Sequence, residues 1–228
     1  MTALSSEQAD GGDGVTIITA IYGGYDSLKP VPEQTFNGEI DLVVVTDDPG
    51  LEVPGWRVYY EPRPGMSRNL AGKRPKMLPW LYTANRRSIW IDASFRVVSP
   101  NFVEQVLEYL PFGVFTHPDR DCIYDEARYS RTMPKYDNEA LEVQVAHYRA
   151  EGHPEHYGLW NGGLIVREHT ECVKQIGTRW LSHCYRFTVQ DQVSLPVVLR
   201  ELGTKPVPIP GSPLANAWLR YEGSARHG

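Results

Sequence analysis

SIWIDAS, residues 88–94, is a short run of apolar side chains that ends in polar ones. Three apolar residues precede Asp92, so the run predicts a buried strand whose last side chain is a carboxylate. Ser94 stands two positions further on and points to the same side, because strand side chains alternate. Such an Asp-x-Ser pattern can hold a divalent metal that bridges a diphosphate, or the aspartate can simply cap a strand-to-loop turn.

The segments on either side of this run alternate between apolar runs and helical patterns. The β-branched runs at 15–21 and 40–46 predict two buried strands, each followed by glycine or aspartate turn residues. This alternation indicates an α/β three-layer domain with a mostly parallel central sheet. Further strands are expected at 56–60, 112–118, 160–167 and 205–209. Helices are expected at 72–82, 102–110, 137–152 and 190–202, and another follows the strand at 160–167 and runs through Trp180 to Tyr185.

The length and composition indicate one folded domain. The chain has 228 residues, enough for a sizeable core, and residues 1–14 are small, polar and acidic. We therefore expect a disordered tail at 1–14 and a single domain at 15–228. No run approaches the roughly 18 apolar residues of a membrane helix, and there is no signal-peptide pattern. Three cysteines without CxxC spacing favour a reducing compartment, so the prediction is a cytoplasmic protein with no membrane span.

Charge is distributed unevenly along the chain. The net charge is −5, yet residues 57–100 carry nine basic side chains against two acidic ones. Such a patch suits a phosphate-bearing ligand, although it can also be a solvated basic face. The acidic total argues against non-specific binding of nucleic acid. The side chains expected to neutralise phosphates are Arg68, Asn69, Lys73, Arg74 and Lys76.

Other candidates follow the remaining strands, because ligands in open α/β sheets bind beyond the carboxyl ends of the strands. His117 and Arg120 follow the apolar run at 112–115. They are either site residues or a structural pair. Asn161 precedes two glycines, which allow a close approach of backbone to ligand. Asp191 stands at a helix start, where it is either an N-cap or a carboxylate that faces a sugar.

These motifs together resemble a known family. From residue 15 to about 198, the chain is similar to the glycosyltransferase-like domain of plant mucilage and turgor-regulation proteins and their bacterial relatives. The matching pieces are VTIITAIYGGYD (15–26), DLVVVTDDP (41–49), GKRPK (72–76), IWIDASF (89–95), HPDRDCIYDEA (117–127), a helix at 144–148, GLWNGG (158–163) and DQVSLP (191–196).

The resemblance implies a GT-A-type nucleotide-binding fold, similar at a distance to the glycogenin and galactinol synthase group. Asp92 and Ser94 match that group's metal and diphosphate motif, Asn161 and Gly162 its donor-sugar strand, and Asp191 and Gln192 its later Asp-Gln pair. By the same resemblance, the base and ribose of a nucleotide would lie by Thr19, Ala20, Tyr22 and Asp47.

One position departs from that pattern. Ser94 stands where many GT-A enzymes have a second acid, and a hydroxyl is a poorer metal ligand than a carboxylate. A Mn²⁺ or Mg²⁺ cofactor is therefore expected to bind weakly or to need further ligands. His227 matches the position of a metal-binding histidine in the glycogenin group.

The resulting hypothesis is transfer of a hexose or pentose from a nucleoside diphosphate sugar. A metal at Asp92, helped by Lys76 or Arg74, would stabilise the departing diphosphate. Asp191 would face the sugar or the acceptor hydroxyl; transfer inverts if it is the general base and retains otherwise. The expected acceptor is a glycan, with a modified nucleobase in DNA as a less favoured choice. The alternative is a non-catalytic domain that binds a sugar nucleotide or glycan; a phosphoryl-transfer enzyme lacks support because there is no P-loop.

Overall fold

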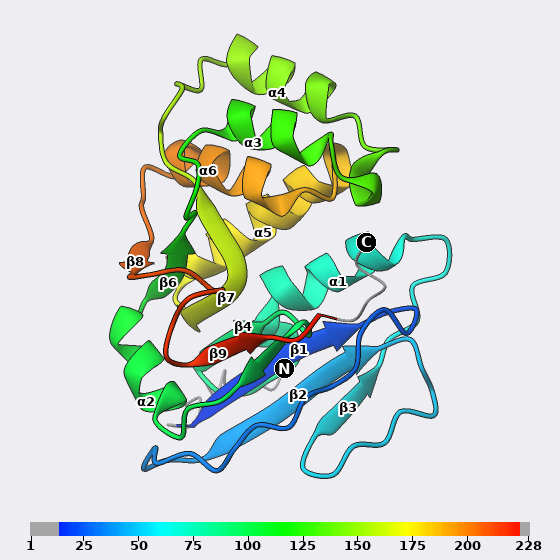
Figure 1. The fold of residues 1–228 in the computed structure, drawn as a ribbon, viewed down its shortest axis with the longest axis vertical. Helices are drawn as coiled ribbons and strands as arrows, with labels where there is room; N and C mark the ends of the chain where they lie inside the picture. Colours follow the sequence, from blue (N-terminus) through cyan, green and yellow to red (C-terminus); the bar gives the residue numbers. More distant parts are fainter. Residues whose placement is uncertain (1–13, 224–228) are drawn as a thin grey trace, which may run out of the picture.

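The structure, a computed structural model, describes residues 14–223. The tail predicted at 1–14, apart from Gly14, lies outside the described residues, and so does His227. A seven-stranded sheet of order β3-β2-β1-β4-β7-β6-β8 forms the centre (Figure 1). Its strands are β1 (Val15–Ile21), β2 (Ile40–Thr46), β3 (Arg57–Tyr60), β4 (Arg87–Ile91), β6 (Phe112–Thr116), β7 (Trp160–Glu168) and β8 (Val207–Ile209).

The predicted α/β fold with a mostly parallel sheet is confirmed. Strands β1 to β4 run parallel to one another, and β6 runs parallel to β8, whereas β7 lies between β4 and β6 and runs antiparallel to both. Because β7 is reversed, it begins at the edge of the sheet where β1 and β4 end. The backbone N–H of Asp92 donates to the carbonyl of Gly163 over 2.9 Å, which ties these two strand ends together.

Helices cover both faces of the sheet (Figure 1). Buried side chains of α1, α5 and α6 share one core with Ile18, Val43 and Ile165 of the sheet. On the other face, Ile17 and Ile89 pack with α2 and with the two-stranded sheet of β5 and β9. The bounds are α1 (Arg68–Met77), α2 (Phe102–Val106), α3 (Ile123–Ser130), α4 (Leu141–Ala150), α5 (Glu171–Arg186), α6 (Asp191–Glu201), β5 (Phe95–Val97) and β9 (Leu219–Tyr221), with 3₁₀ turns at 79–81, 107–109 and 134–136. None of the helices in residues 14–223 is both long and apolar enough to cross a membrane.

Helix α1 differs from its predicted range of 72–82. It begins at Arg68 because the Ser67 side chain caps it, accepting a hydrogen bond from the Leu70 N–H at 3.2 Å. Pro75 therefore lies inside the helix rather than in its first turn, and a 3₁₀ turn starts at Pro79. The earlier start places Lys73 in mid-helix, one turn before Lys76 and on the same side.

Two other segments are not among the elements expected from the sequence. The C-terminal part contains β9, which pairs antiparallel with β5 just after the Asp92 turn. Residues 123–130 form α3, in which Glu126 is buried. Both segments matter for the site, because β9 lies beside the turn after β4 and α3 packs against α6, which begins at Asp191.

Helices α1 and α5 approach closely at Gly177, where an added methyl group would lie 2.1 Å from the backbone oxygen of Met77. We expect Gly177→Ala to lower the free energy of unfolding by about 1–3 kcal/mol, the usual cost of overpacking. Gly72→Ala is the matched control, since no atom lies within 4 Å of its added methyl group. Alanine there should raise stability by about 0.5–1 kcal/mol. Urea unfolding measures both; equal stability of the two variants would contradict the packing described.

Candidate functional site

A pocket of about 570 Å³ opens at the edge of the sheet where β1 and β4 end. Its walls come from the ends of these strands, the start of β7, α1 and the start of α6. This is the place where open α/β sheets bind ligands. The predicted site residues that line the pocket are Ala20, Tyr22, Arg68, Asn69, Lys73, Lys76, Asp92, Ser94, Asn161, Gly162, Asp191 and Gln192.

The Asp92 carboxylate emerges from the end of β4 and lines this pocket. Its side chain is 38% exposed, and its Oδ1 accepts hydrogen bonds from the indole of Trp90 at 2.7 Å and from the ammonium of Lys76 at 3.3 Å. The turn that follows is held by Lys29, whose ammonium donates to the Ala93 carbonyl over 2.6 Å. The carboxylate is therefore both oriented by protein donors and accessible from the pocket.

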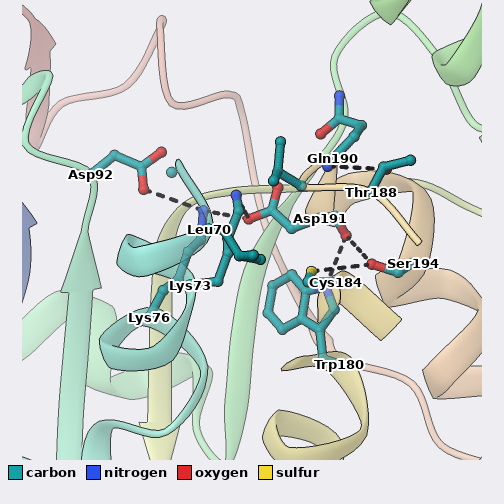
Figure 2. A network of polar contacts seen from close by, with 12 residues as sticks. Leu70, Lys73, Lys76, Asp92, Trp180, Cys184, Thr188, Gln190, Asp191 and Ser194 are labelled. Atoms are coloured by element: carbon teal, nitrogen blue, oxygen red, sulfur yellow. Dashed lines mark hydrogen bonds and ion pairs between the residues drawn. The ribbon is translucent and has the colours of Figure 1, made fainter. Parts of the chain in front are cut away.

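A chain of buried charges runs inward from Asp92 (Figure 2). The ammonium of Lys76 also lies 2.8 Å from Oδ2 of Asp191, and the ammonium of Lys73 lies 2.9 Å from the same oxygen. The side chains of Lys76 and Asp191 are only 7% and 8% exposed. We call Lys73, Lys76 and Asp191 the lysine–aspartate cluster. It places two cations of α1 beneath the pocket.

Hydrogen bonds with α5 and α3 hold the start of α6 in place. The backbone oxygen of Asp191 accepts a hydrogen bond from the indole of Trp180 at 2.8 Å. The side-chain amide of Gln190 donates to Glu126 at 2.9 Å and to Ser130 at 2.7 Å, both on α3. The N-cap position belongs to Gln190, so the carboxylate of Asp191 pairs with lysines instead of capping the helix.

The cluster shifts the ionisation of its members. Burial opposes the charged form of Asp191, but the ammonium groups of Lys73 and Lys76 outweigh it and hold the pKa of this carboxyl well below its ordinary value. Burial alone would lower the pKa of Lys76, yet the carboxylates of Asp191 and Asp92 raise it above its ordinary value. Both groups are therefore charged at neutral pH, and Asp191 is a poor proton acceptor.

Lys135 is a pocket residue that the sequence patterns missed. It comes from the 3₁₀ turn at 134–136, which has no motif to mark it, and it lines the pocket with Met133 and Tyr136. Part of its side chain is exposed, but the surrounding protein and the nearby ammonium of Lys73 lower the pKa of Lys135. Tyr25, Pro213, Leu214 and Tyr221 are further lining residues that were not predicted.

Three predicted donor-binding residues do not line this pocket. Thr19 lies on the face of β1 that carries Ile17, opposite Ala20, because strand side chains alternate. Asp47 accepts two hydrogen bonds from the N–H of Gly23, at 2.9 and 3.1 Å, and so ties together the loops after β1 and β2. Arg74 points away and binds Glu61 over 2.6 Å and the Tyr82 hydroxyl over 2.8 Å.

His117 and Arg120 also lie outside the pocket lining. Arg120 binds the buried carboxylate of Glu126 over 2.6 Å, and His117 lies 3.6 Å from the same carboxylate. The Nδ1 atom of His117 accepts hydrogen bonds from the backbone N–H groups of Asp119 and Arg120, each at 3.2 Å. These two residues hold the start of α3 in place through Glu126.

The residues that the structure describes, which exclude His227, do not fit a divalent-metal centre of the Asp-x-Asp kind. Within residues 14–223 there is no group of three or more His, Cys, Asp or Glu side chains that could hold a metal ion. Beside Asp92 the pocket offers the Ser94 hydroxyl where an Asp-x-Asp motif has its second acid. The other carboxylates of the lining, Asp26 and Asp191, already form ion pairs with lysines. Oδ1 of Asp92 already accepts from Trp90 and Lys76, so a cation occupies its inner side.

Comparison with known proteins agrees with this fold. Residues 32–209 match the family described as TOD1/MUCI70, glycosyltransferase-like domain. The chain is also 27% identical over 225 residues to the probable hexosyltransferase MUCI70 of Arabidopsis thaliana, which covers 84% of this chain. It spans 38% of the length of that plant relative. Since the family match covers well over half of its residues, the chain belongs to the TOD1/MUCI70 family of glycosyltransferase-like domains.

Proposed function

We propose that the pocket binds a nucleoside diphosphate sugar and transfers the sugar, as a hexosyl group, to an acceptor. The observation that carries this proposal is the meeting of an accessible carboxylate, Asp92, with the buried ammonium of Lys76 in one pocket at the ends of β1 and β4. The name of the Arabidopsis relative, a probable hexosyltransferase, supports the choice of a hexose.

The proposal assigns each part of the donor to a wall of the pocket. The nucleoside lies against Ala20 and Tyr22 at the end of β1, and the sugar against Asn161 and Gly162 at the start of β7. The diphosphate then lies over Lys76. When the bond from the sugar to the diphosphate breaks, negative charge develops on the leaving oxygen. A fixed ammonium stabilises that charge without having to reorganise.

Asp92 and Asp191 have different roles in this proposal. Asp191 is held by two ammonium groups, and its lowered pKa makes it a weak base, so it orients the lysines. Asp92 is the accessible carboxylate of the pair and is assigned contact with the sugar or the acceptor hydroxyl. Gln192, the next residue of α6, also lines the pocket and offers an amide to the sugar.

A glycan is the proposed acceptor. The pocket lining includes Tyr25, Met133, Leu214 and Tyr221, and the last two are 67% and 49% exposed. Apolar and aromatic surfaces of this kind cover the faces of sugar rings, and the tyrosine hydroxyls bind their polar edges. No comparable support exists for a nucleobase acceptor, since the chain has a net charge of −5.

The test is a screen of UDP-, GDP- and dTDP-sugars for transfer and donor hydrolysis, with Asp92→Asn beside the wild type. We expect turnover with at least one donor and a loss of about 10²-fold or more in Asp92→Asn, the range for a positioned proton-transfer group. Asp119→Asn, an exposed aspartate outside the pocket lining, is the matched control and should keep its rate. Donor binding without turnover would instead identify a sugar-nucleotide-binding domain.

A further inference from the structure

We infer that Lys73, Lys76 and Lys135 bind the donor's diphosphate in the place of a divalent cation, so that the pocket takes up diphosphates without added metal. The inference deepens the proposed function and rests on it. It follows from where the cations lie, from how they are paired and from what a metal ion would meet at Asp92.

Lys76 occupies a position that a metal ion would otherwise take. Its ammonium lies 3.3 Å from Asp92 and 2.8 Å from Asp191, so it bridges two carboxylates from different elements. A divalent ion bound at Asp92 would lie beside this ammonium, which is only 7% exposed, and neighbouring like charges repel more strongly where burial weakens screening by water. The lysine already neutralises the carboxylates that a metal would need as ligands.

The three lysines leave the pocket with positive charge to spare. Asp92 and Asp191 offset two of these cations, and Lys135 forms no ion pair within residues 14–223. The other carboxylate of the lining, Asp26, is paired with Lys29, and Arg68 adds a further cation. Its ammonium lies over the ring of Tyr136, 4.8 Å from the centroid, and close enough to Lys73 to be repelled by it. A bound dianion would relieve that repulsion, which is the electrostatic signature of an anion site.

Because Gly162 has no side chain, it leaves the space that the end of the Lys76 side chain occupies. A methyl group there would lie 3.2 Å from both Cε and Nζ of Lys76. Gly162→Ala would therefore push the ammonium aside by a few tenths of an ångström, without removing any charge. The variant tests position separately from charge.

The experiment is calorimetric titration of inorganic pyrophosphate and of UDP, first in EDTA and then with excess Mg²⁺ or Mn²⁺. We expect binding in EDTA, with dissociation constants that change by less than about threefold when metal is added. The affinity should fall as salt is raised, because screening weakens contacts between exposed charges.

Variants assign the binding to these lysines. Lys135→Gln leaves every ion pair of the buried cluster intact and should weaken pyrophosphate binding about tenfold, the usual loss for one hydrogen bond to a charged group. Gly162→Ala should weaken it severalfold. Lys205→Gln, an exposed lysine over Tyr157 and outside the pocket lining, is the matched control and should bind as the wild type does.

The outcomes separate this inference from the proposed function. Pyrophosphate binding that needs metal, or a Lys135→Gln variant that binds as tightly as Lys205→Gln, overturns the inference, while sugar transfer in the donor screen would still stand. Binding in EDTA that depends on Lys135 supports the inference, even if no donor is turned over and the transferase proposal fails.

Discussion

Lys76→Met is expected to reduce the turnover of sugar transfer by about 10²–10³-fold, the cost of removing one preorganised group that stabilises a developing negative charge. Methionine nearly matches the length and flexibility of the lysine stem, so the change removes the charge and little volume. Among residues 14–223, Lys76 alone pairs with both Asp92 and Asp191, at 3.3 and 2.8 Å. Its loss therefore affects the accessible and the buried carboxylate together.

The same variant should also be less stable. Asp191 would keep a single cation, Lys73, at 2.9 Å, in a place where its side chain is 8% exposed. Removing one partner of a buried ion pair costs about 3–5 kcal/mol, and the remaining lysine should reduce that cost. Turnover must be measured below the melting temperature of the variant, with Lys205→Met as the control. Wild-type turnover in folded Lys76→Met would show that this ammonium does not take part in the reaction.

Asp191→Asn is expected to have the largest effect on folding. It keeps the shape of the side chain but leaves the ammonium groups of Lys73 and Lys76 without their shared carboxylate. Two buried cations 2.9 and 2.8 Å from a neutral amide would repel one another, so we expect a loss of about 3–5 kcal/mol in the free energy of unfolding. Urea unfolding at pH 7 measures it, and a loss below about 1 kcal/mol would contradict the cluster.

The effect of Asp191→Asn should depend on pH in a defined direction. The folded pKa of Asp191 lies below its unfolded value, which is about 3.9. The stability that its charge contributes is therefore fully present above that unfolded value and is lost as pH falls through the lower, folded one. The difference in stability between wild type and Asp191→Asn should shrink below about pH 4. A difference that stays constant from pH 7 to pH 3 would contradict this assignment.

The stability that the charge of Lys76 contributes depends on pH in the opposite direction. Its folded pKa lies above the unfolded value of about 10.4, so its contribution is present below that value and is lost only as pH rises through the higher, folded one. Between these limits both partners stay charged. The cluster is therefore stable over the whole physiological range.

Sequence patterns predicted the sheet because buried strands are marked by apolar runs. The run before Asp92 correctly placed a carboxylate at a strand end, and the runs at 15–21 and 40–46 became β1 and β2. The start of α1 was missed because its residues are mostly polar, and only the Ser67 cap marks where it begins. Likewise β9 is three residues long and depends on pairing with β5, a contact that local patterns do not contain.

The chemistry of the site was less predictable than its place. Lysines are almost never buried unless paired, and the partner of Lys76 that explains its burial, Asp191, lies 115 positions further along the chain. The same separation hid the fact that Asp191 is ion-paired. His117 and Arg120 seemed suited to a ligand because they follow a strand, but Glu126, which binds them, could not be recognised as buried from its sequence context.

The most direct measurement is a crystal structure of the chain with UDP bound, grown in EDTA. The pocket at the ends of β1 and β4 should then hold the diphosphate within hydrogen-bond distance of the ammonium groups of Lys76 and Lys135, with the uracil toward Tyr22. A diphosphate bound anywhere else on the protein, or a pocket that stays empty at saturating nucleotide, would contradict the assignment of this pocket as the donor site.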